Sequence, residues 1–145
     1  MAVFIIRAMG QTPYDKPTPT FQDVAKTYWA YGYIERMYQL GITGGCCTSP
    51  MLYCPGSSVN RRQMAAFLCR ANSKGPLTPA TPTFADVPAS DPGYGYVERM
   101  ADAASWGGTA VTGGCAVSPP RYCPYDPVTR GQMAVFIVRA FSIPL

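Results

Sequence analysis

The sequence has 145 residues, a net charge of +4 and no histidine. Its lysines and arginines are spread without a basic run, which argues against nucleic-acid binding, and no apolar stretch approaches the ~20 residues that span a bilayer. The lack of histidine removes the commonest metal ligand and the Ser-His and Cys-His pairs of nucleophilic catalysis. We find no alternative catalytic constellation, so we predict a chain without enzyme activity, cofactor or metal.

The beginning of the chain recurs near its end. Residues 1–6 are MAVFII, and residues 132–140 are QMAVFIVRA. Four further segments recur in the same order: PTFQDV, YGYIERM, ITGGC and YCP return as PTFADV, YGYVERM, VTGGC and YCP. Such self-similarity is typical of repeat proteins. We therefore predict two whole repeats, residues 21–71 and 84–145, preceded at residues 1–8 by the second helix of a truncated first repeat.

Two segments of equal length join the repeats. Residues 9–20 and 72–83 are both 12 long and rich in Thr and Pro, so we expect extended spacers on the surface. Met1 aligns with Met64 and Met133, which lie inside a predicted helix. We therefore expect Met1 to be an internal methionine of a longer or processed protein.

Each repeat is predicted to be a helix, a loop and a second helix. The first helix is expected at residues 28–40 and 93–105. The second has apolar residues at the i, i+3, i+4, i+7 spacing of a buried stripe: Met64, Phe67, Leu68 and Ala71, then Met133, Phe136, Ile137 and Ala140. Asn60 with Gln63, and Thr129 with Gln132, have the spacing of a capping box at its start. The pattern predicts a loop-rich, all-α fold.

The carboxylates occupy equivalent positions in the two repeats. Asp23 and Asp86 could be a glycoside-hydrolysing pair, but equivalent residues of separate repeats are better explained as groups that pin the first helix of each copy. Glu35 and Glu98 follow the same pattern, and we expect them on the helix surface beside Arg36 and Arg99.

Six cysteines are present, and four of them form a repeated pattern. Cys46 and Cys54 are eight apart, as are Cys115 and Cys123, so we predict one disulfide in each loop, worth roughly 2.5 kcal/mol in the entropic model. The remaining two, Cys47 and Cys69, are both replaced in the second copy, by Ala116 and Val138. Their joint presence in one copy suggests a third bond, Cys47–Cys69. Zinc would need four clustered ligands, so disulfides and an oxidising, extracellular location are expected.

These motifs resemble the S-layer homology domain, a repeat of surface proteins of bacteria. The resemblance rests on F-x-D-V, W-A-x-x-Y-I, G-I-x-G and V-T-R-x-Q-M-A-x-F-x-x-R-A. The first three are at Phe21, Asp23, Val24, Trp29, Ala30, Tyr33, Ile34, Gly41, Ile42 and Gly44; the last is at Val128, Thr129, Arg130, Gln132, Met133, Ala134, Phe136, Arg139 and Ala140.

The resemblance implies a role at the cell surface. Such domains attach proteins to the cell envelope, often through a wall polysaccharide, and three repeats commonly pack as a pseudo-symmetric helical bundle with glycan grooves between neighbours. The family's binding arginine corresponds to Arg61 and Arg130, where a guanidinium beside a helix N-terminus can hold a carboxylate bidentately. The motif's glutamate is replaced here by Gln63 and Gln132.

Other candidate glycan contacts are Trp29, Trp106, Gly44 and Gly113. Trp29 and Trp106 can stack on sugar rings or pack between helices; we expect packing for Trp29 and leave Trp106 open. Gly44 and Gly113 lie in threonine–glycine–glycine segments, which favour a turn over a phosphate loop.

Two functions follow from these features. The first is a non-catalytic extracellular module that attaches a protein to the cell surface through a wall glycan, without membrane insertion. The second is a structural subunit that binds copies of itself head to tail and forms a filament, sheath or layer. The repeats could also be the tail of a larger secreted enzyme whose catalytic domain lies outside this chain.

Overall fold

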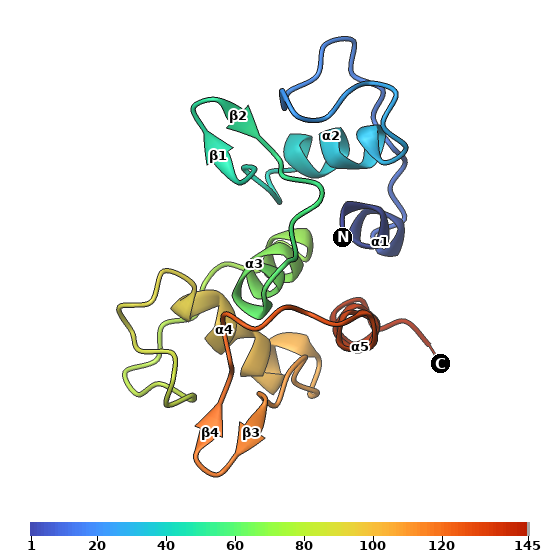
Figure 1. Cartoon of the computed structure of the whole chain (residues 1–145). Helices are drawn as coiled ribbons and strands as arrows, with labels where there is room; N and C mark the ends of the chain where they lie inside the picture. The colour runs from blue at the N-terminus through green and yellow to red at the C-terminus, as the bar shows by residue number, and fades with distance from the viewer. Residues whose placement is uncertain (145) are drawn as a thin grey trace. The chain divides into compact units, whose positions relative to one another are not determined.

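The computed structural model describes residues 1–144, which form two compact units (Figure 1). The first unit, residues 1–57, contains α1 (Ala2–Ala8), α2 (Tyr31–Gln39), β1 (Cys47–Thr48) and β2 (Met51–Leu52). The second, from residue 58, contains α3 (Arg61–Ala71), α4 (Tyr94–Ala101), the short 3-10 helix η1 (Ala103–Trp106), β3 (Ala116–Val117), β4 (Pro120–Arg121) and α5 (Arg130–Ala140).

The expectation of an all-α fold is too simple. Helices dominate the regular structure of residues 1–144, but each unit also contains a two-stranded antiparallel hairpin. Cys47 pairs with Leu52 in the first hairpin, and Ala116 pairs with Arg121 in the second. The residues between the paired cysteines were expected to be a loop. They form a hairpin because the disulfide holds their ends together and the backbone groups then bond across it.

The compact units are divided differently from the sequence repeats. The second helix of one repeat packs against the first helix of the next, so α1 packs on α2 and α3 packs on α4 (Figure 1). The same contact occurs in both pairs: the Nε atoms of Arg7 and Arg70 each lie 3.3 Å from a tyrosine hydroxyl, of Tyr33 and Tyr96 respectively. The first unit therefore ends inside the repeat 21–71, between its hairpin and its second helix.

The first helices are shorter than predicted. The segment expected at residues 28–40 is helical from Tyr31 to Gln39, and the segment at 93–105 is helical from Tyr94 to Ala101. Asp102 is extended and begins the separate helix η1. The second copy contains six more residues than the first at this point, and η1 lies within that extra length. The other predicted feature, the capping boxes, is confirmed: Asn60 with Gln63 begins α3, and Thr129 with Gln132 begins α5.

The Thr/Pro segments lie on the following helix and are held there by hydrogen bonds. Glu35 accepts hydrogen bonds from the N–H and hydroxyl of Thr20, both at 2.7 Å, and Glu98 accepts the same pair from Thr83 at 2.8 and 2.6 Å. The expectation that these glutamates lie on the surface is wrong, since Glu35 is 1% exposed and Glu98 is 2% exposed. Their carboxylates are buried because they accept the hydrogen bonds of the threonine that ends each linker.

Glycines allow the hairpins to approach the core. Gly45 and Gly114 have φ of +85° and +90°, and a Cβ on either would collide with a hairpin carbonyl and with an aromatic ring. For Gly114 these are the Arg121 carbonyl and the Phe84 ring, whose Cε1 would be 2.8 Å away. Only glycine fits both the backbone conformation and the space.

We predict that Gly114→Ala destabilises the fold by about 1–3 kcal/mol, because alanine is strained at this φ and its methyl group overlaps the hairpin. The matched control is Gly113→Ala, since a Cβ on Gly113 meets nothing within 4 Å. Thermal or urea unfolding of the two variants measures the difference. Equal stability of the two variants would contradict the prediction.

Candidate glycan-binding site

The two predicted loop disulfides are present. Cys46 is bonded to Cys54 with Cα atoms 6.0 Å apart, and Cys115 is bonded to Cys123 with Cα atoms 6.1 Å apart.

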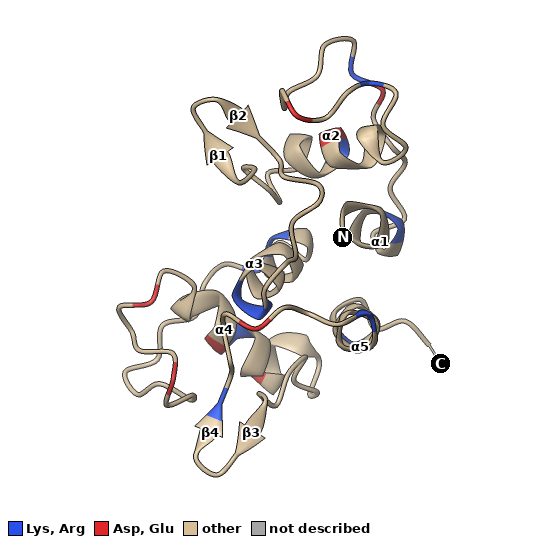
Figure 2. Ribbon diagram, viewed as in Figure 1, with Lys and Arg blue, Asp and Glu red and all other residues tan. Residues whose placement is uncertain are grey.

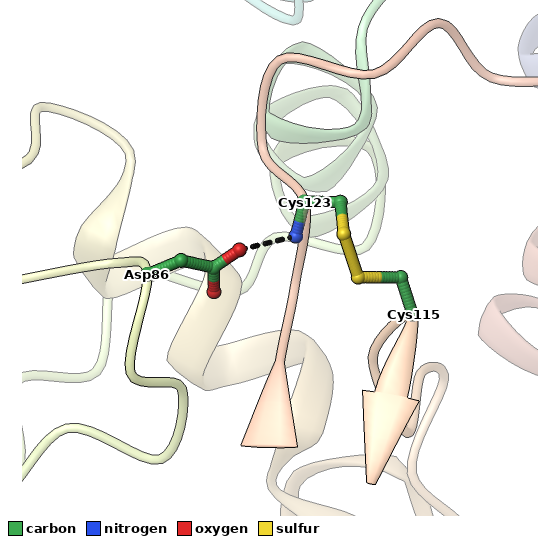
Figure 3. Close-up of side chains that lie close together, drawn as sticks. All are labelled: Asp86, Cys115 and Cys123. Carbon is green, nitrogen blue, oxygen red and sulfur yellow. Dashed lines mark hydrogen bonds between the residues drawn. A yellow bond between two sulfur atoms is a disulfide. The ribbon is translucent and has the colours of Figure 1, made fainter. Parts of the chain in front are cut away.

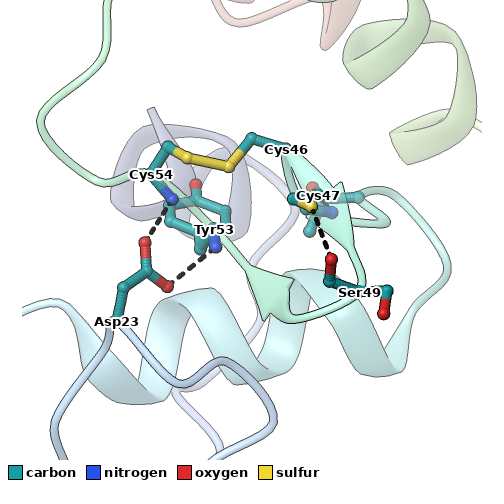
Figure 4. The surroundings of a disulfide bond; sticks show 8 residues. Asp23, Cys46, Cys47, Ser49, Tyr53 and Cys54 are labelled. Carbon is teal, nitrogen blue, oxygen red and sulfur yellow. Dashed lines mark hydrogen bonds between the residues drawn. A yellow bond between two sulfur atoms is a disulfide. The ribbon is translucent and has the colours of Figure 1, made fainter.

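In the first unit, the Asp23 carboxylate accepts hydrogen bonds from the N–H groups of Tyr53 and Cys54, at 2.9 and 2.7 Å (Figure 4). The expectation that this aspartate pins the first helix is therefore wrong. It holds the segment that directly follows β2 instead, up to the disulfide-bonded Cys54.

Asp86 has the same role in the second unit. It accepts from the N–H group of Tyr122 at 2.8 Å and from that of Cys123 at 2.8 Å, the second of which is drawn in Figure 3. Partial burial raises the pKa of the Asp86 carboxyl. Backbone hydrogen bonds from Tyr122, Cys123 and Asp86 itself, together with the positive charge of Arg121, outweigh burial and hold that pKa below its ordinary value. Ligand atoms of Asp86, Cys115 and Cys123 lie within 4.8 Å of one another, yet the two sulfurs are bonded to each other and offer no thiolate to a metal.

The predicted Cys47–Cys69 disulfide is wrong, since both thiols are free. Cys69 is buried in α3 with Sγ 3.6 Å from the Tyr96 carbonyl oxygen, and Cys47 faces the Ser49 carbonyl oxygen at 3.5 Å in its own hairpin (Figure 4). Each thiol thus has a separate local partner. Burial raises the pKa of Cys69 to about 12, so it stays a protonated core side chain.

Arg61 is the most unusual of the predicted site residues. It is the first residue of α3, but only 3% of it is exposed. Its Nε donates to the Tyr122 carbonyl at 2.7 Å, and the guanidinium carbon lies 4.8 Å from the centre of the Tyr122 ring and 5.4 Å from that of Phe136. We call Arg61, Tyr122 and Phe136 the Arg61 cage. The sequence did not identify its two aromatic members, because they come from the next repeat.

The cage leaves one donor of Arg61 unsatisfied. Among the described residues, Nη2 is the buried side-chain nitrogen or oxygen without a hydrogen-bond partner, and no carboxylate pairs with the guanidinium. A buried, unpaired donor on a charged group costs free energy. The backbone N–H groups of Arg61 and Arg62 already donate to the Asp126 and Pro124 carbonyls, at 2.9 and 3.0 Å. An anion at this point would therefore be held by the guanidinium and not by the helix N-terminus.

Arg130 lies at the equivalent position of α5 and is exposed. No aromatic ring among residues 1–144 lies over it, so the two arginines that the sequence treats as equal differ in their surroundings. The Arg61 cage is formed by two aromatic residues of the repeat that follows Arg61. Figure 2 also shows basic and acidic residues spread over the elements of both units, without a basic cluster.

The expected packing of Trp29 is wrong, and Trp106, whose environment was left open, is buried. Trp29 was expected to pack, but it is 75% exposed, with its ring centroid 5.9 Å from that of Tyr28. Trp106 is 8% exposed; its Nε1 donates to the Arg99 carbonyl at 2.6 Å, and the Lys74 Nζ lies 4.9 Å from its ring centroid. Trp29 precedes the start of α2 by two residues and so lies outside its packed face. An exposed ring is what stacking on a sugar requires, and Trp29 meets that condition.

The remaining glycine candidates lie in turns. Gly44 and Gly113 are exposed and have open space at their Cα atoms. The following glycine in each copy donates its N–H to a threonine hydroxyl, Gly45 to Thr43 at 3.1 Å and Gly114 to Thr112 at 3.0 Å. The expected turn is therefore formed, and a glycan contact at Gly44 or Gly113 stays a prediction.

Comparison with known proteins connects this geometry to a family. The model of the S-layer homology domain matches residues 20–45, the segment that holds the buried Phe21, the hairpin-pinning Asp23 and the exposed Trp29. Residues 20–45 thus carry S-layer homology sequence. A relative named "Endoglucanase", from Bacillus sp. (strain KSM-635), is 30% identical over 149 residues, which cover 98% of this chain and 14% of the relative. The chain thus spans a small part of the relative's length.

The S-layer homology segment places the chain at the bacterial cell surface. The two disulfides fit this extracellular location, because such bonds persist in oxidising compartments. In the part of the chain that the structure describes, no helix has the length and apolar character to cross a membrane.

We predict that Asp86→Asn destabilises the second unit at neutral pH and flattens its acid unfolding. Because the folded pKa of Asp86 is depressed, its stabilising effect is fully present above the unfolded pKa of about 3.9 and is lost as pH falls through the folded value. Unfolding measured from pH 7 to pH 2 tests this. Asp15→Asn is the control, since Asp15 is 79% exposed in a surface pair with Lys26; the same loss in both variants would contradict the prediction.

Proposed function

We propose that this chain is a non-catalytic module that attaches a protein to the cell surface by binding a carboxylate-bearing wall glycan. The observation that carries this proposal is the buried Arg61 Nη2 without a partner. A carboxylate oxygen would satisfy that nitrogen and would also supply the counter-charge that the Arg61 cage lacks. A planar guanidinium between aromatic rings presents its donors in a fixed direction, which suits recognition of one acidic group on a sugar.

The exposed tryptophan supports the same function. Trp29 offers an open ring face, and pyranose rings present C–H groups that pack on such a face. We propose that Trp29 offers an apolar glycan contact in the first unit. As a separate contact in the second unit, we propose that Arg61 holds the carboxylate and that the exposed Arg130 offers a further cation. Trp106 is no longer proposed as a stacking residue, because its ring is buried. We further propose that the repeats pack as a pseudo-symmetric bundle of the S-layer homology type.

The same observations bear on catalysis. The candidate carboxylate pair Asp23 and Asp86 is occupied, since each accepts two backbone hydrogen bonds. Glu35 and Glu98 are likewise buried against threonines. We propose that the module itself performs no reaction. If the chain is a segment of a longer enzyme, we propose that the catalytic residues lie outside it.

Self-assembly is the second candidate, and the exposure of α5 favours it. Val135 of α5 is 45% exposed, whereas its α1 counterpart, Val3, is 8% exposed. An apolar helix face that is covered in one copy and open in another is suited to contact with a further chain. We propose this as an alternative in which copies of the chain bind head to tail in a filament, sheath or layer.

Arg61→Lys is expected to weaken binding to purified acidic wall polysaccharide by about tenfold or more. Lysine keeps the charge but has no planar pair of donors, and a tenfold loss corresponds to about 1.4 kcal/mol. Arg62→Lys is the matched control on the same helix turn, because Arg62 pairs with Asp91 outside the cage. Binding is measured by calorimetry with native polysaccharide and with polysaccharide whose carboxylates have been amidated. Equal affinity of both variants for the native glycan would overturn the role of the cage.

Trp29→Ala and Trp106→Ala are expected to have opposite effects. Trp29→Ala should weaken glycan binding and leave the melting temperature unchanged, because the ring is solvent-exposed. Trp106→Ala should cost about 3–5 kcal/mol of stability, as other large buried aromatics do on truncation. Glycan titration and thermal unfolding of both variants are the measurements. Undiminished glycan binding by Trp29→Ala would remove Trp29 from the proposed glycan contacts.

A further inference from the structure

Tyr125 places an exposed aromatic ring in the same unit as the Arg61 cage. It is 66% exposed, whereas the other tyrosines of residues 1–144 are buried or half-buried. The residues on either side of it, Pro124 and Asp126, accept at their carbonyls the backbone N–H groups of Arg62 and Arg61. The segment that carries Tyr125 is therefore bonded to the first turn of α3, where the Arg61 side chain also begins.

Two contacts fix the orientation of the Tyr125 ring. The guanidinium carbon of Arg62 lies 5.0 Å from the ring centre, and the hydroxyl donates to Asp91 Oδ2 at 3.3 Å. Asp91 is fixed in turn, because its Oδ1 accepts from the Gly93 N–H at 2.7 Å and lies 3.4 Å from Arg62 Nη1. Among the described residues, no other cation or ring lies over Tyr125, so an oriented ring keeps one face open.

The first unit does not contain this arrangement. Gly56 occupies the position of Tyr125, and Tyr28 occupies the position of Asp91. The first unit nevertheless forms the same hairpin and the same disulfide as the second. The repeat therefore folds without a ring at the position of Tyr125. A rigid, exposed tyrosine that the fold does not require is suited to contact with a ligand, because it offers a large contact area and loses little freedom on binding.

The charges near Tyr125 favour a ligand with one acidic group. Arg62 balances the Asp91 carboxylate, so among the described residues near Tyr125 the Arg61 guanidinium is the buried cation that lacks a counter-charge. Asp126 follows Tyr125 in the chain and is exposed, and its carboxylate would repel a ligand that is negative along its whole length. A mainly neutral sugar chain with a single carboxylate fits these charges.

We propose that Tyr125 stacks on a pyranose ring of the glycan whose carboxylate is bound by Arg61. The C–H groups on the apolar face of the sugar pack on the open face of the tyrosine ring, whose π-electrons carry partial negative charge. The ligand class is a glycan with neutral sugar faces and a single carboxylate at the site, in contrast to a polyanion such as a chain of phosphodiesters. This inference rests on the proposed glycan binding and adds to it an aromatic contact in the second unit.

Arg62 supports the Tyr125 ring from the face opposite the sugar and does not itself contact the glycan. What this support requires is a cation over the ring and a partner for Asp91. A lysine ammonium can supply both, since it also interacts with an aromatic face. Arg62→Lys is therefore expected to leave the stacking contact in place, whereas removal of the Tyr125 ring abolishes it.

The first test is calorimetric titration of the 145-residue chain with purified acidic wall polysaccharide. Tyr125→Ala is expected to weaken binding about fivefold, as the loss of one aromatic contact does, with a nearly unchanged melting temperature because the ring is exposed. Tyr125→Phe keeps the ring face and is expected to restore most of the lost affinity. Val117→Ala is the matched control, since it truncates an apolar side chain of the same unit that is 88% exposed, and it is expected to bind like the wild type.

The second test repeats the titrations with polysaccharide whose carboxylates have been amidated. Tyr125→Ala should lose the same factor with both forms, because amidation leaves the sugar face unchanged, whereas Arg61→Lys should lose affinity for the native form alone. A wild type that binds neither form overturns the proposed function and the stacking together. Wild-type affinity in Tyr125→Ala, or an equal loss in Tyr125→Phe, overturns the stacking alone. Binding of poly(glycerol phosphate) as tight as that of the native polysaccharide overturns the ligand class.

Discussion

The structure depends on one packing relation: the second helix of a repeat covers the first helix of the repeat that follows. The pairs α1–α2 and α3–α4 each join two successive repeats in the same way, with a guanidinium from one helix against a tyrosine from the next. The hairpins and linkers then attach to the covered helices. A repeat in this chain is therefore a unit of sequence, and the stable unit of structure extends across two of them.

Much of this arrangement was visible in the sequence. The second helices, their capping boxes and the two eight-residue disulfides follow from local spacing, and all are present. Features that depend on distant residues were not predictable in the same way. Glu35 and Glu98 have the spacing of surface residues, and only the folded linker shows that their carboxylates are buried by Thr20 and Thr83. The Cys47–Cys69 bond was inferred because both cysteines are present in one repeat and absent from the other. That pattern carries no information on the distance between the two sulfur atoms.

The candidate site shows the same limit. The position of Arg61 was identified from its motif, but its burial comes from Tyr122 and Phe136, which lie more than 60 residues away in the sequence. Arg130 has the same motif position, but its side chain is exposed. The motif therefore sets the position of the arginine on its helix, and residues distant in the sequence set its burial. A charge enclosed by two rings and one carbonyl has little access to water, and an approaching carboxylate would meet a donor that has already lost its hydration.

Hydrogen bonds to the following helix fix the length of each linker. Four hydrogen bonds between linker and helix recur at the same spacing in both copies. In the first copy they join Thr12 to Arg36, Tyr14 to Gly32, Lys16 to Tyr31 and Thr20 to Glu35. In the second copy they join Gly75 to Arg99, Leu77 to Gly95, Pro79 to Tyr94 and Thr83 to Glu98. One residue more or less would put the later hydrogen bonds out of step with the helix. The two copies differ in length only beyond α4, where these bonds no longer reach. The length of each proline-rich segment is thus fixed by the helix it crosses, and growth of the repeat is confined to the segment that contains η1.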